Sequence, residues 1–524
     1  MNEKRNDVSG FPESAHGVAL IAYTISLEAW RRGIEVKFFK TFVKNQIKAR
    51  YTLSYAGREH TFQLSLGDKV SKEARSIGKS KTLTRRYLTD ANVSMPEGEV
   101  FSVYNSEFCE AIGYAKALGY PVIIKPARAS LAIGVHTNIM DEEALVRALD
   151  EVHGELGYND IIIERHVAGE DTRAYVIEDQ VIGAFKRVPA RVEGDGIQSL
   201  EALIDSKNIY RKQNPHLSGN LIEKNDALKT KIRAQGYHMD TIIEKGKRIT
   251  LSDSTFAKDC SEIVDITDEV SQDYKRTAIQ AIRNIPGMPL AGVDIMMDQE
   301  TDRNYVLEVN CRPNIGGHLY PSVGRSRDIP SAIIDYYFPE STEVDPGYNV
   351  NFVYDFDSVT SFLKSGKAQS VTLPALPKKN VENRHFKVTG DVEKVKKWII
   401  KNATGYRLGG SIEDIGTHQL QLIIAGRRRH IEDFLEKMMQ TQAGVNIETT
   451  KENAWDEVIM YPFDSSHSAF SSVAEHLSDD VENQLKQLQK ENKALHKEIN
   501  KLKESRSWKI TKPLRAIGSR KKRK

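Results

Sequence analysis

Residues 294 to 317 constrain what this chain can fold into more than any other stretch does. Asp294 ends one apolar run, and Glu308 and Asn310 end a second one, with a polar turn between the two runs. Successive side chains of a strand point to opposite faces, so Glu308 and Asn310 share a face, and pairing of the strands can bring Asp294 beside them. Three such oxygen ligands suit Mg²⁺, which completes its shell with water and phosphate oxygens. Taken alone, the hairpin fits solvated surface acids equally well.

Length and composition indicate a multidomain globular protein. At 524 residues the chain is too long for a single core, and we expect about three or four domains. A content of 40% hydrophobic and 28% charged residues excludes the disordered and fibrous classes, and a net charge of +3 argues against a nucleic-acid-coating protein. Three cysteines without metal-ligand spacing predict neither a disulfide framework nor a zinc site. Without an apolar leader or a run of about 18 apolar residues, we expect a soluble, cytoplasmic protein.

Two basic segments are candidates for contacts with an anion. Residues 79 to 92 predict a basic helix in which Lys81 and Arg85, four residues apart, share one face. A solvated basic face is the plain interpretation of that pair. Lys125 ends an apolar strand just before a small-residue loop, 127 to 135, whose backbone can approach a phosphate together with the ammonium group. Neither a Walker-type pattern nor GxGxxG occurs there, so the loop alone is a weak indication.

Several motifs follow one another in an order that is typical of one ligase family. They span roughly residues 70 to 335 and are SKTLTRRYL, YPVIIKP, a small-residue loop ending in GVH, IIIERHVAGEDTRAYVI, KRVPARVEGDGIQSLEALI, VDITDEV, GVDIM and LEVNCRPNIGGH. The ordered series carries more weight than any single motif. On these motifs the chain resembles the ATP-grasp ligases, and within them the ATP-grasp domain of the cyanophycin synthetase and bifunctional glutathione synthetase type.

The resemblance implies an ATP-grasp fold, with two α+β lobes around the nucleotide. The nucleotide-binding residues that it implies are Lys81, Lys125, Ser130, Gly134, Glu164, Val167 and Lys186. In this assignment Glu164 and Val167 lie on the adenine and ribose side, and Lys186 or Arg187 reaches the γ-phosphate. The metal ligands that it implies are Asp294, Glu308 and Asn310, with Mg²⁺ as the ion and Mn²⁺ as its alternative. The chain departs from the family pattern at Ser80 and Arg85, where Asp and Lys are usual.

The reaction that the resemblance implies joins a carboxylate to an amine through an acyl phosphate, in peptide or surface-polymer biosynthesis. Such phosphoryl transfer depends on positioning and charge neutralisation. Arg312 would stabilise the acyl phosphate, and Lys186 would act at the phosphate. Arg173 and Arg191 are the candidates for a substrate carboxylate, because guanidinium binds carboxylates bidentately. Two alternatives stay open, a kinase-like ATP-grasp phosphotransferase and a membrane-associated nucleotide-binding scaffold without turnover.

We expect an α+β multidomain chain. Its parts are an N-terminal α/β lobe at 1–78, the ATP-grasp domain at 79–338, a linker at 339–382, an acylphosphatase-like domain at 383–463, a linker and coiled coil at 464–504 and a basic amphipathic tail at 505–524. Substrate choice is expected in the polar excursion 206–260. After residue 383, the order strand, helix, strand, strand, helix predicts a ferredoxin-like α/β sandwich. Lys394 and Asp414 replace the arginine and asparagine of acylphosphatases, so we expect a structural or regulatory role there.

The C-terminal segments predict interaction partners for this chain. Apolar heptad spacing over 481–502, with Asn492 at an a position, predicts a short parallel coiled coil and therefore a homodimer. The tail 505–524 is basic and carries Trp508 among spaced aliphatic residues, which favours peripheral contact with an anionic membrane at its inner face; a disordered solubilising tail is the alternative. The remaining expected partners are small-molecule carboxylate and amine substrates, and nucleic acid is not expected.

Overall fold

The computed structural model describes residues 12–463, with gaps at 44–45, 104–107, 130–132, 253–259, 299–300, 302, 343–346, 366–367, 379, 443 and 456, and also 474–475 and 490. The predicted coiled coil, apart from Lys490, the predicted tail and Ser130 lie outside these residues. Helices and strands are mixed throughout the described part, which confirms the predicted α/β content. No helix in that part is long and apolar enough to cross a membrane.

The N-terminal lobe is built on a sheet of the order β23-β17-β1-β2-β3-β4. Its elements are α1 (Ala19–Arg31), β1 (Glu35–Val43), β2 (Gln46–Tyr55), β3 (Arg58–Gln63), β4 (Leu66–Gly67) and, from the C-terminal part, β23 (Ala474–Glu475). The turn between β2 and β3 falls on Ala56 and Gly57, with φ values of 48° and 77°. Two consecutive positive φ angles match the right-handed twist of a tight hairpin.

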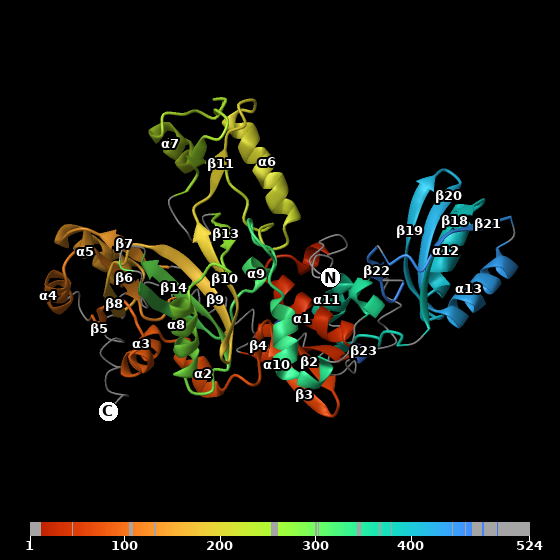
Figure 1. Cartoon of the computed structure of the whole chain (residues 1–524), viewed down its shortest axis with the longest axis horizontal. Coiled ribbons are helices and arrows are strands. Elements are labelled where there is room, and N and C mark those ends of the chain that lie inside the picture. Colours follow the sequence, from red (N-terminus) through yellow and green to blue (C-terminus); the bar gives the residue numbers. More distant parts are fainter. Residues whose placement is uncertain are drawn as a thin grey trace.

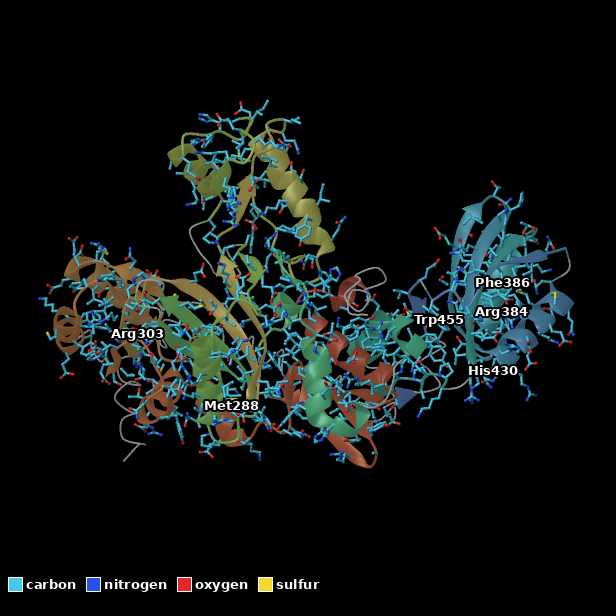
Figure 2. The ribbon with its side chains drawn as sticks, viewed as in Figure 1. Met288, Arg303, Arg384, Phe386, His430 and Trp455 are labelled. Carbon is cyan, nitrogen blue, oxygen red and sulfur yellow. The ribbon has the colours of Figure 1, made fainter. Side chains whose placement is uncertain are left out.

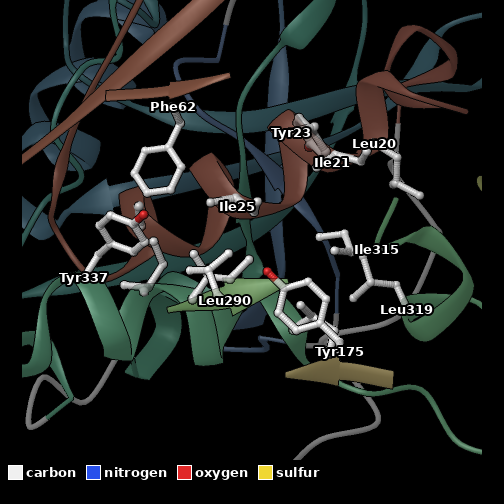
Figure 3. Packing of buried hydrophobic residues seen from close by; sticks show 14 of the residues in the cluster. Leu20, Ile21, Tyr23, Ile25, Phe62, Tyr175, Leu290, Ile315, Leu319 and Tyr337 are labelled. Carbon is white, nitrogen blue, oxygen red and sulfur yellow. The ribbon is translucent and has the colours of Figure 1, made fainter. Parts of the chain in front are cut away.

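A later segment completes this lobe. It supplies α10 (Ile329–Tyr337), β16 (Phe352–Val353), α11 (Phe356–Ser365) and β17 (Ser370–Thr372), and β17 pairs antiparallel with β1. The tyrosine between β16 and α11, Tyr354, is fully buried, with its ring 5.1 Å from that of Tyr23 and 5.6 Å from that of Trp30. Figure 3 shows part of the core cluster, in which Tyr23 and Tyr337 belong to α1 and α10. Part of the predicted linker 339–382 therefore packs in the core, a role that its prolines and short apolar runs did not reveal.

Two further sheets follow in the chain and carry the predicted site residues. The first has the order β5-β8-β6-β7 and a core of its own. Its elements and the helices beside it are α2 (Lys72–Ile77), α3 (Lys81–Asp90), β5 (Gly98–Ser102), α4 (Cys109–Leu118), β6 (Val122–Pro126), β7 (His136–Ile139), α5 (Glu142–Leu149) and β8 (Asp160–Arg165). β5 forms one edge of this sheet, and Figure 1 shows α3 near it.

The second of these sheets has the order β13-β10-β9-β14-β15. It is formed by β9 (Glu170–Ile177), β10 (Gln180–Val188), β13 (Glu262–Asp265), β14 (Leu290–Asp298) and β15 (Arg303–Asn310), with α8 (Gln272–Arg283) against it and α9 (Gly316–Leu319) after β15. β14 and β15 pair antiparallel in a register that sets Asp294 opposite Glu308. The strand pairing inferred from the alternation of residues 294 to 310 is therefore found.

The excursion between β10 and β13 forms a small unit with its own core. It contains β11 (Arg191–Glu193), α6 (Leu200–Gln213), α7 (Asp226–Ala234) and β12 (Arg248–Thr250). Leu200 and Ile204 of α6 pack with Leu228 and Ile232 of α7 in this core. Figure 1 shows the unit projecting from the sheet that carries β9 and β10. The sequence predicted a polar excursion over 206–260, because apolar positions are sparse there. Their helical spacing, which corresponds to α6 and α7, was not recognised.

The C-terminal domain is a sheet of the order β16-β22-β19-β20-β18-β21. It comprises β18 (Val381–Thr389), α12 (Val392–Asn402), β19 (Gly409–Gly416), β20 (Gln419–Arg427), α13 (Arg428–Thr441), β21 (Asn446–Glu452) and β22 (Ile459–Met460). Phe386 packs in the core with residues of both helices. Figure 2 shows Trp455 on the side facing the N-terminal lobe, where its ring lies 6.0 Å from that of Phe352.

Replacing Tyr354 by alanine tests the role of this segment in the N-terminal lobe. The variant removes a fully buried ring, so we expect the free energy of unfolding to fall by about 3–5 kcal/mol. Tyr354→Phe is the matched control, because it keeps the ring and removes only the 2.6 Å hydrogen bond to the Ser26 hydroxyl, for a loss of about 1 kcal/mol. Urea unfolding measures both losses. A small loss for Tyr354→Ala would contradict the packing described.

Candidate active site

A pocket lies where α3, the sheet containing β6 and β8, and β15 meet. Four of the sequence-predicted site residues, Lys81, Lys125, Glu164 and Glu308, line it although they are far apart in the chain. The other lining residues are Gly78, Thr84, Arg85, Met95, Ile162 and Leu307. The pocket therefore combines cations and carboxylates from four separate parts of the sequence.

Glu164 is the central charge of the pocket. It is 2% exposed, and its carboxylate accepts hydrogen bonds from Lys125 Nζ at 2.5 Å and from the Arg85 guanidinium. Burial alone would raise the pKa of Glu164, but Lys125 and Arg85 more than offset that effect and lower it. Arg85 also donates to the carbonyl oxygens of Pro96 and Gly98. The basic face of α3 is thus engaged by an internal acid, and the plain interpretation of a solvated face is wrong for Arg85.

Lys81 opens α3 and reaches both neighbouring sheets. Ser80 is the N-cap residue, and its hydroxyl accepts the backbone N–H of Leu83. Ser and Asp are equally good caps, so the departure from the family pattern at this position keeps the helix start. Lys81 Nζ donates to the carbonyl oxygen of Ala129 at 2.8 Å and lies 3.8 Å from Glu308 Oε2. The lysine therefore links the small-residue loop to the acid on β15.

The predicted metal ligands lie on the neighbouring strands β14 and β15. Asp294, in the middle of β14, is opposite Glu308, and Asn310, which ends β15, is opposite Gly292. Asn310 Oδ1 accepts the backbone N–H of Arg312 at 2.9 Å, while the Glu308 side chain is 41% exposed. The described part of the chain holds no cluster of three or more His, Cys, Asp or Glu side chains. Two carboxylates and one amide nevertheless fit Mg²⁺, which takes few protein ligands and keeps water or phosphate oxygens.

Asp294 is held by two arginines. Its carboxylate accepts Arg173 Nε at 2.6 Å and Nη2 at 2.7 Å, and Arg187 Nη2 at 3.1 Å. Burial would raise the pKa of Asp294, but these two guanidinium groups hold it well below its usual range. Asp294 is therefore ionised at neutral pH. Arg173, predicted to bind a substrate carboxylate, has an internal carboxylate as its partner in this structure.

The other predicted catalytic residues lie on or near the same sheet. Lys186 Nζ donates to Glu170 at 2.7 Å, and Arg187 Nη1 donates to Asp171 at 2.5 Å. Sequence reasoning missed these acids, since only the register of β9 against β10 brings them beside the cations. The Arg312 side chain is exposed just after β15. Their roles toward a substrate stay predictions.

Two of the predicted nucleotide-binding positions lie at the margins of this site. Gly134, in the small-residue loop, has a φ of +68°, and a Cβ built on it would lie 2.9 Å from Pro126. The backbone there therefore requires glycine. Val167 is half-buried in the connection between β8 and β9, next to His166, whose N–H donates to the carbonyl of Pro121.

Two histidines with buried ring nitrogens lie near Arg173 and were not predicted. His318 is 2% exposed, its ring lies 4.6 Å from that of Phe185, and neither ring nitrogen has a hydrogen-bond partner among the residues described. Burial chiefly lowers the pKa of His318 to about 3, and burial with nearby arginines lowers the pKa of His216 to about 4. Both rings are neutral at pH 7. The adjacent Gly316-Gly317 pair was the one sequence signal for such close packing.

Comparison with known proteins finds relatives that are similar to about half of this chain. No protein-family model matches it. It is similar to cyanophycin synthetase of Geminocystis herdmanii (strain PCC 6308), with 26% identity over 302 residues, which is 56% of this chain and 34% of that protein. It is also similar to the glutathione biosynthesis bifunctional protein GshAB of Desulfotalea psychrophila (strain LSv54 / DSM 12343), with 27% identity over 267 residues, covering 49% and 33% of the two chains.

A solved structure, that of a bifunctional glutathione synthetase from Pasteurella multocida, shares 21% identity with a TM-score of 0.45 over 56% of this chain and 40% of that chain. The chain spans about a third of the length of the curated relatives it matches. These curated relatives confirm the predicted resemblance to ligases of the cyanophycin synthetase and bifunctional glutathione synthetase type.

Glu164→Gln tests the charge balance of the pocket. The variant leaves Lys125 and Arg85 buried without their acid, and we expect the free energy of unfolding to fall by about 3–5 kcal/mol. Glu97→Gln is the control, since Glu97 pairs with Arg165 at the surface, where such pairs contribute up to about 1 kcal/mol. Chemical denaturation at pH 7 measures both variants. Equal losses would show that Glu164 does not hold the two cations.

The buried histidines predict a dependence of stability on pH. The unfolded chain binds protons near its ordinary histidine pKa of about 6.5, whereas folded His318 stays neutral down to a pKa of about 3. Stability is therefore complete above pH 6.5 and falls as the pH drops below it, by about 1.4 kcal/mol per pH unit for each such histidine. Between pH 6.5 and 4, the free energy of unfolding of His318→Met should fall less steeply with decreasing pH than that of the unaltered protein, by about 1.4 kcal/mol per pH unit. Parallel pH profiles would contradict the assignment.

Proposed function

We propose that the chain is an ATP- and Mg²⁺-dependent carboxylate–amine ligase that forms an amide bond through an acyl phosphate. The observation that supports this most is the convergence of Lys81, Lys125, Glu164 and Glu308 on one pocket. The similarity to cyanophycin synthetases and to GshAB proteins supports the same activity. A peptide or surface polymer is the proposed kind of product.

The charges of the pocket suit a nucleotide. Three cations, Lys81, Arg85 and Lys125, face two carboxylates, Glu164 and Glu308. An excess of positive charge at a partly closed site favours phosphate oxygens, which can replace Glu164 as the partner of Lys125. The hinge after β8, with Val167, is the proposed adenine side, and Lys186 with Arg187 is the proposed γ-phosphate side. The nucleotide would thus lie between the two sheets that flank α3.

Asp294, Glu308 and Asn310 are the residues that would hold Mg²⁺. The ionised state of Asp294 and the fixed amide oxygen of Asn310 make the donor set ready for a divalent cation. When bound, the ion supplies charge neutralisation at the phosphate oxygens. Arg173 and Arg187 hold Asp294 in place by direct hydrogen bonds. They are therefore positioning residues for this carboxylate as well as candidates for substrate contact.

The proposed reaction has two steps. A substrate carboxylate oxygen attacks the γ-phosphorus of ATP, and ADP leaves. The amine nitrogen then attacks the acyl carbon, inorganic phosphate leaves, and the nitrogen loses a proton. Arg312 is proposed to stabilise the acyl phosphate. Cys311, next to it, is not a nucleophile in this scheme, because burial raises the pKa of its thiol and keeps it protonated.

We infer that the C-terminal domain is a ferredoxin-like sandwich related to acylphosphatases. The strand order β21-β18-β20-β19, with α12 and α13 between the strands in sequence, supports that assignment. Asp414 pairs with Lys396 at 2.5 Å, so the position of the family's asparagine is occupied by an acid in an ion pair. A structural or regulatory role is proposed rather than hydrolysis. Dimerisation through 481–502 and membrane contact through 505–524 are further proposals that rest on the sequence pattern.

Turnover tests the proposed activity. Purified full-length protein with Mg²⁺ and ATP is assayed for ADP release against a panel of amino acids, peptides and sugar acids. We expect one acid and amine pair to stimulate release. Glu308→Ala should lower kcat by about a hundredfold or more, because it removes a proposed Mg²⁺ ligand.

Asp298→Ala, in the turn of the same hairpin, is the matched control and should keep full activity. ADP release that needs the acid but no amine would replace the ligase by a phosphotransferase. An active Glu308→Ala variant would show that the metal and phosphate site lies elsewhere.

A further inference from the structure

Arg211 is the most deeply buried basic residue in the described part of the chain. It lies in α6 and is 1% exposed. Its Nε donates to the carbonyl oxygen of Asn220 at 2.8 Å, but its Nη2 is buried and has no hydrogen-bond partner. No carboxylate among the residues described forms an ion pair with it. Burial chiefly lowers the pKa of Arg211, which indicates a guanidinium deprived of both water and an acid.

An unpaired buried guanidinium is unfavourable, because arginine stays protonated and its desolvation is not compensated. The fold supplies acids to comparable cations. Arg32, which is 7% exposed, pairs with Glu28 and Asp335. Lys207, one turn before Arg211 on α6, pairs with Glu262. Among the described residues, Arg211 is therefore an exception, because it is buried without an acid.

His216 is a second unpartnered group at the same place. It follows α6 directly, and its Nδ1 is buried without a hydrogen-bond partner. A Cβ built on Gly316 would lie 2.6 Å from this nitrogen, so the glycine is what allows the ring to lie there. Arg211, Arg173 and Arg187 all lie within electrostatic range of His216. Arg173 and Arg187 in turn contact Asp294, which connects this place to the proposed metal site.

We propose that Arg211 and His216 bind a carboxylate group of a substrate, one that does not itself react. A carboxylate is an acceptor-only group, which suits the free Nη2–H of Arg211 and a neutral imidazole that donates from Nδ1. The inference rests on the proposed function and narrows its substrates to molecules that carry a carboxylate besides the reacting groups, such as an amino acid or a dicarboxylic acid. The α6 excursion then determines specificity through a charge buried beneath it.

The stability of the ligand-free protein distinguishes binding from a structural role. Arg211→Met removes an unpaired buried charge, so we expect the Tm of the full-length protein without ligand to stay equal or to rise. Lys207→Met is the matched control on the same helix, and it should lower the Tm because it leaves Glu262 unpaired. A Tm for Arg211→Met that falls as far as that of Lys207→Met, or a failure to fold, would overturn the proposal in favour of a structural arginine.

Binding is measured by calorimetry without nucleotide, with L-aspartate, L-glutamate, their diamides and inorganic phosphate as probes. We expect at least one of the two amino acids to bind and its diamide not to bind. Arg211→Met should weaken binding by tenfold or more, and the affinity of Arg211→Lys should lie between those of Arg211→Met and the unaltered protein. No binding by either amino acid, binding that Arg211→Met leaves unchanged, or binding of phosphate alone would each overturn the proposal. ADP release plays no part in this experiment, so its outcome and that of the turnover assay are independent.

Discussion

The ion pairs of Glu164 with Lys125 and Arg85 are the interaction on which the arrangement of the site depends. Glu164 belongs to β8, Lys125 to β6 and Arg85 to α3, so one carboxylate fixes a helix against a sheet. Glu164 and Lys125 are buried and Arg85 is partly buried, so loss of the shared carboxylate would leave two cations without a partner away from water. The same contacts orient Lys125 and line up Lys81, one turn before Arg85, with Glu308 on the neighbouring sheet. Stability and the proposed phosphate site therefore rest on the same residues.

Charge is distributed in a similar way on the sheet formed by β9, β10 and β14. Arg173, Arg187 and Lys186 each have an acid within hydrogen-bond distance, and Asp294 is shared between the two arginines. Such pairing keeps potential substrate-binding cations in fixed positions while no substrate is bound. A ligand with phosphate or carboxylate oxygens would then exchange one anionic partner for another, at a smaller cost than that of ordering free side chains. The site is preorganised by its own carboxylates.

Local spacing in the sequence predicted which nearby residues share a face, whereas the site residues themselves were predicted through the resemblance carried by the ordered motifs. The alternation around Glu308 and Asn310 predicted their shared face, and the four-residue interval between Lys81 and Arg85 predicted theirs, because both periods are fixed by backbone geometry. Contacts between distant segments were beyond reach. The pairing of β17 with β1, the burial of Tyr354 and the placing of Glu170 and Asp171 beside cations all depend on sheet register and packing, which short-range patterns do not encode.

In the excursion that contains α6, the prediction from composition missed a small apolar core and a buried arginine. Its polar sequence indicated a surface loop, yet Leu200 and Ile204 form a core with α7 and Arg211 is buried on the same helix. A small apolar core gives the unit enough rigidity to hold a charge away from water, which a solvated loop lacks. Natural sequences tolerate an uncompensated charge mainly where a ligand compensates it. The burial of Arg211 on α6 is the observation behind our proposal that this excursion takes part in choosing the substrate.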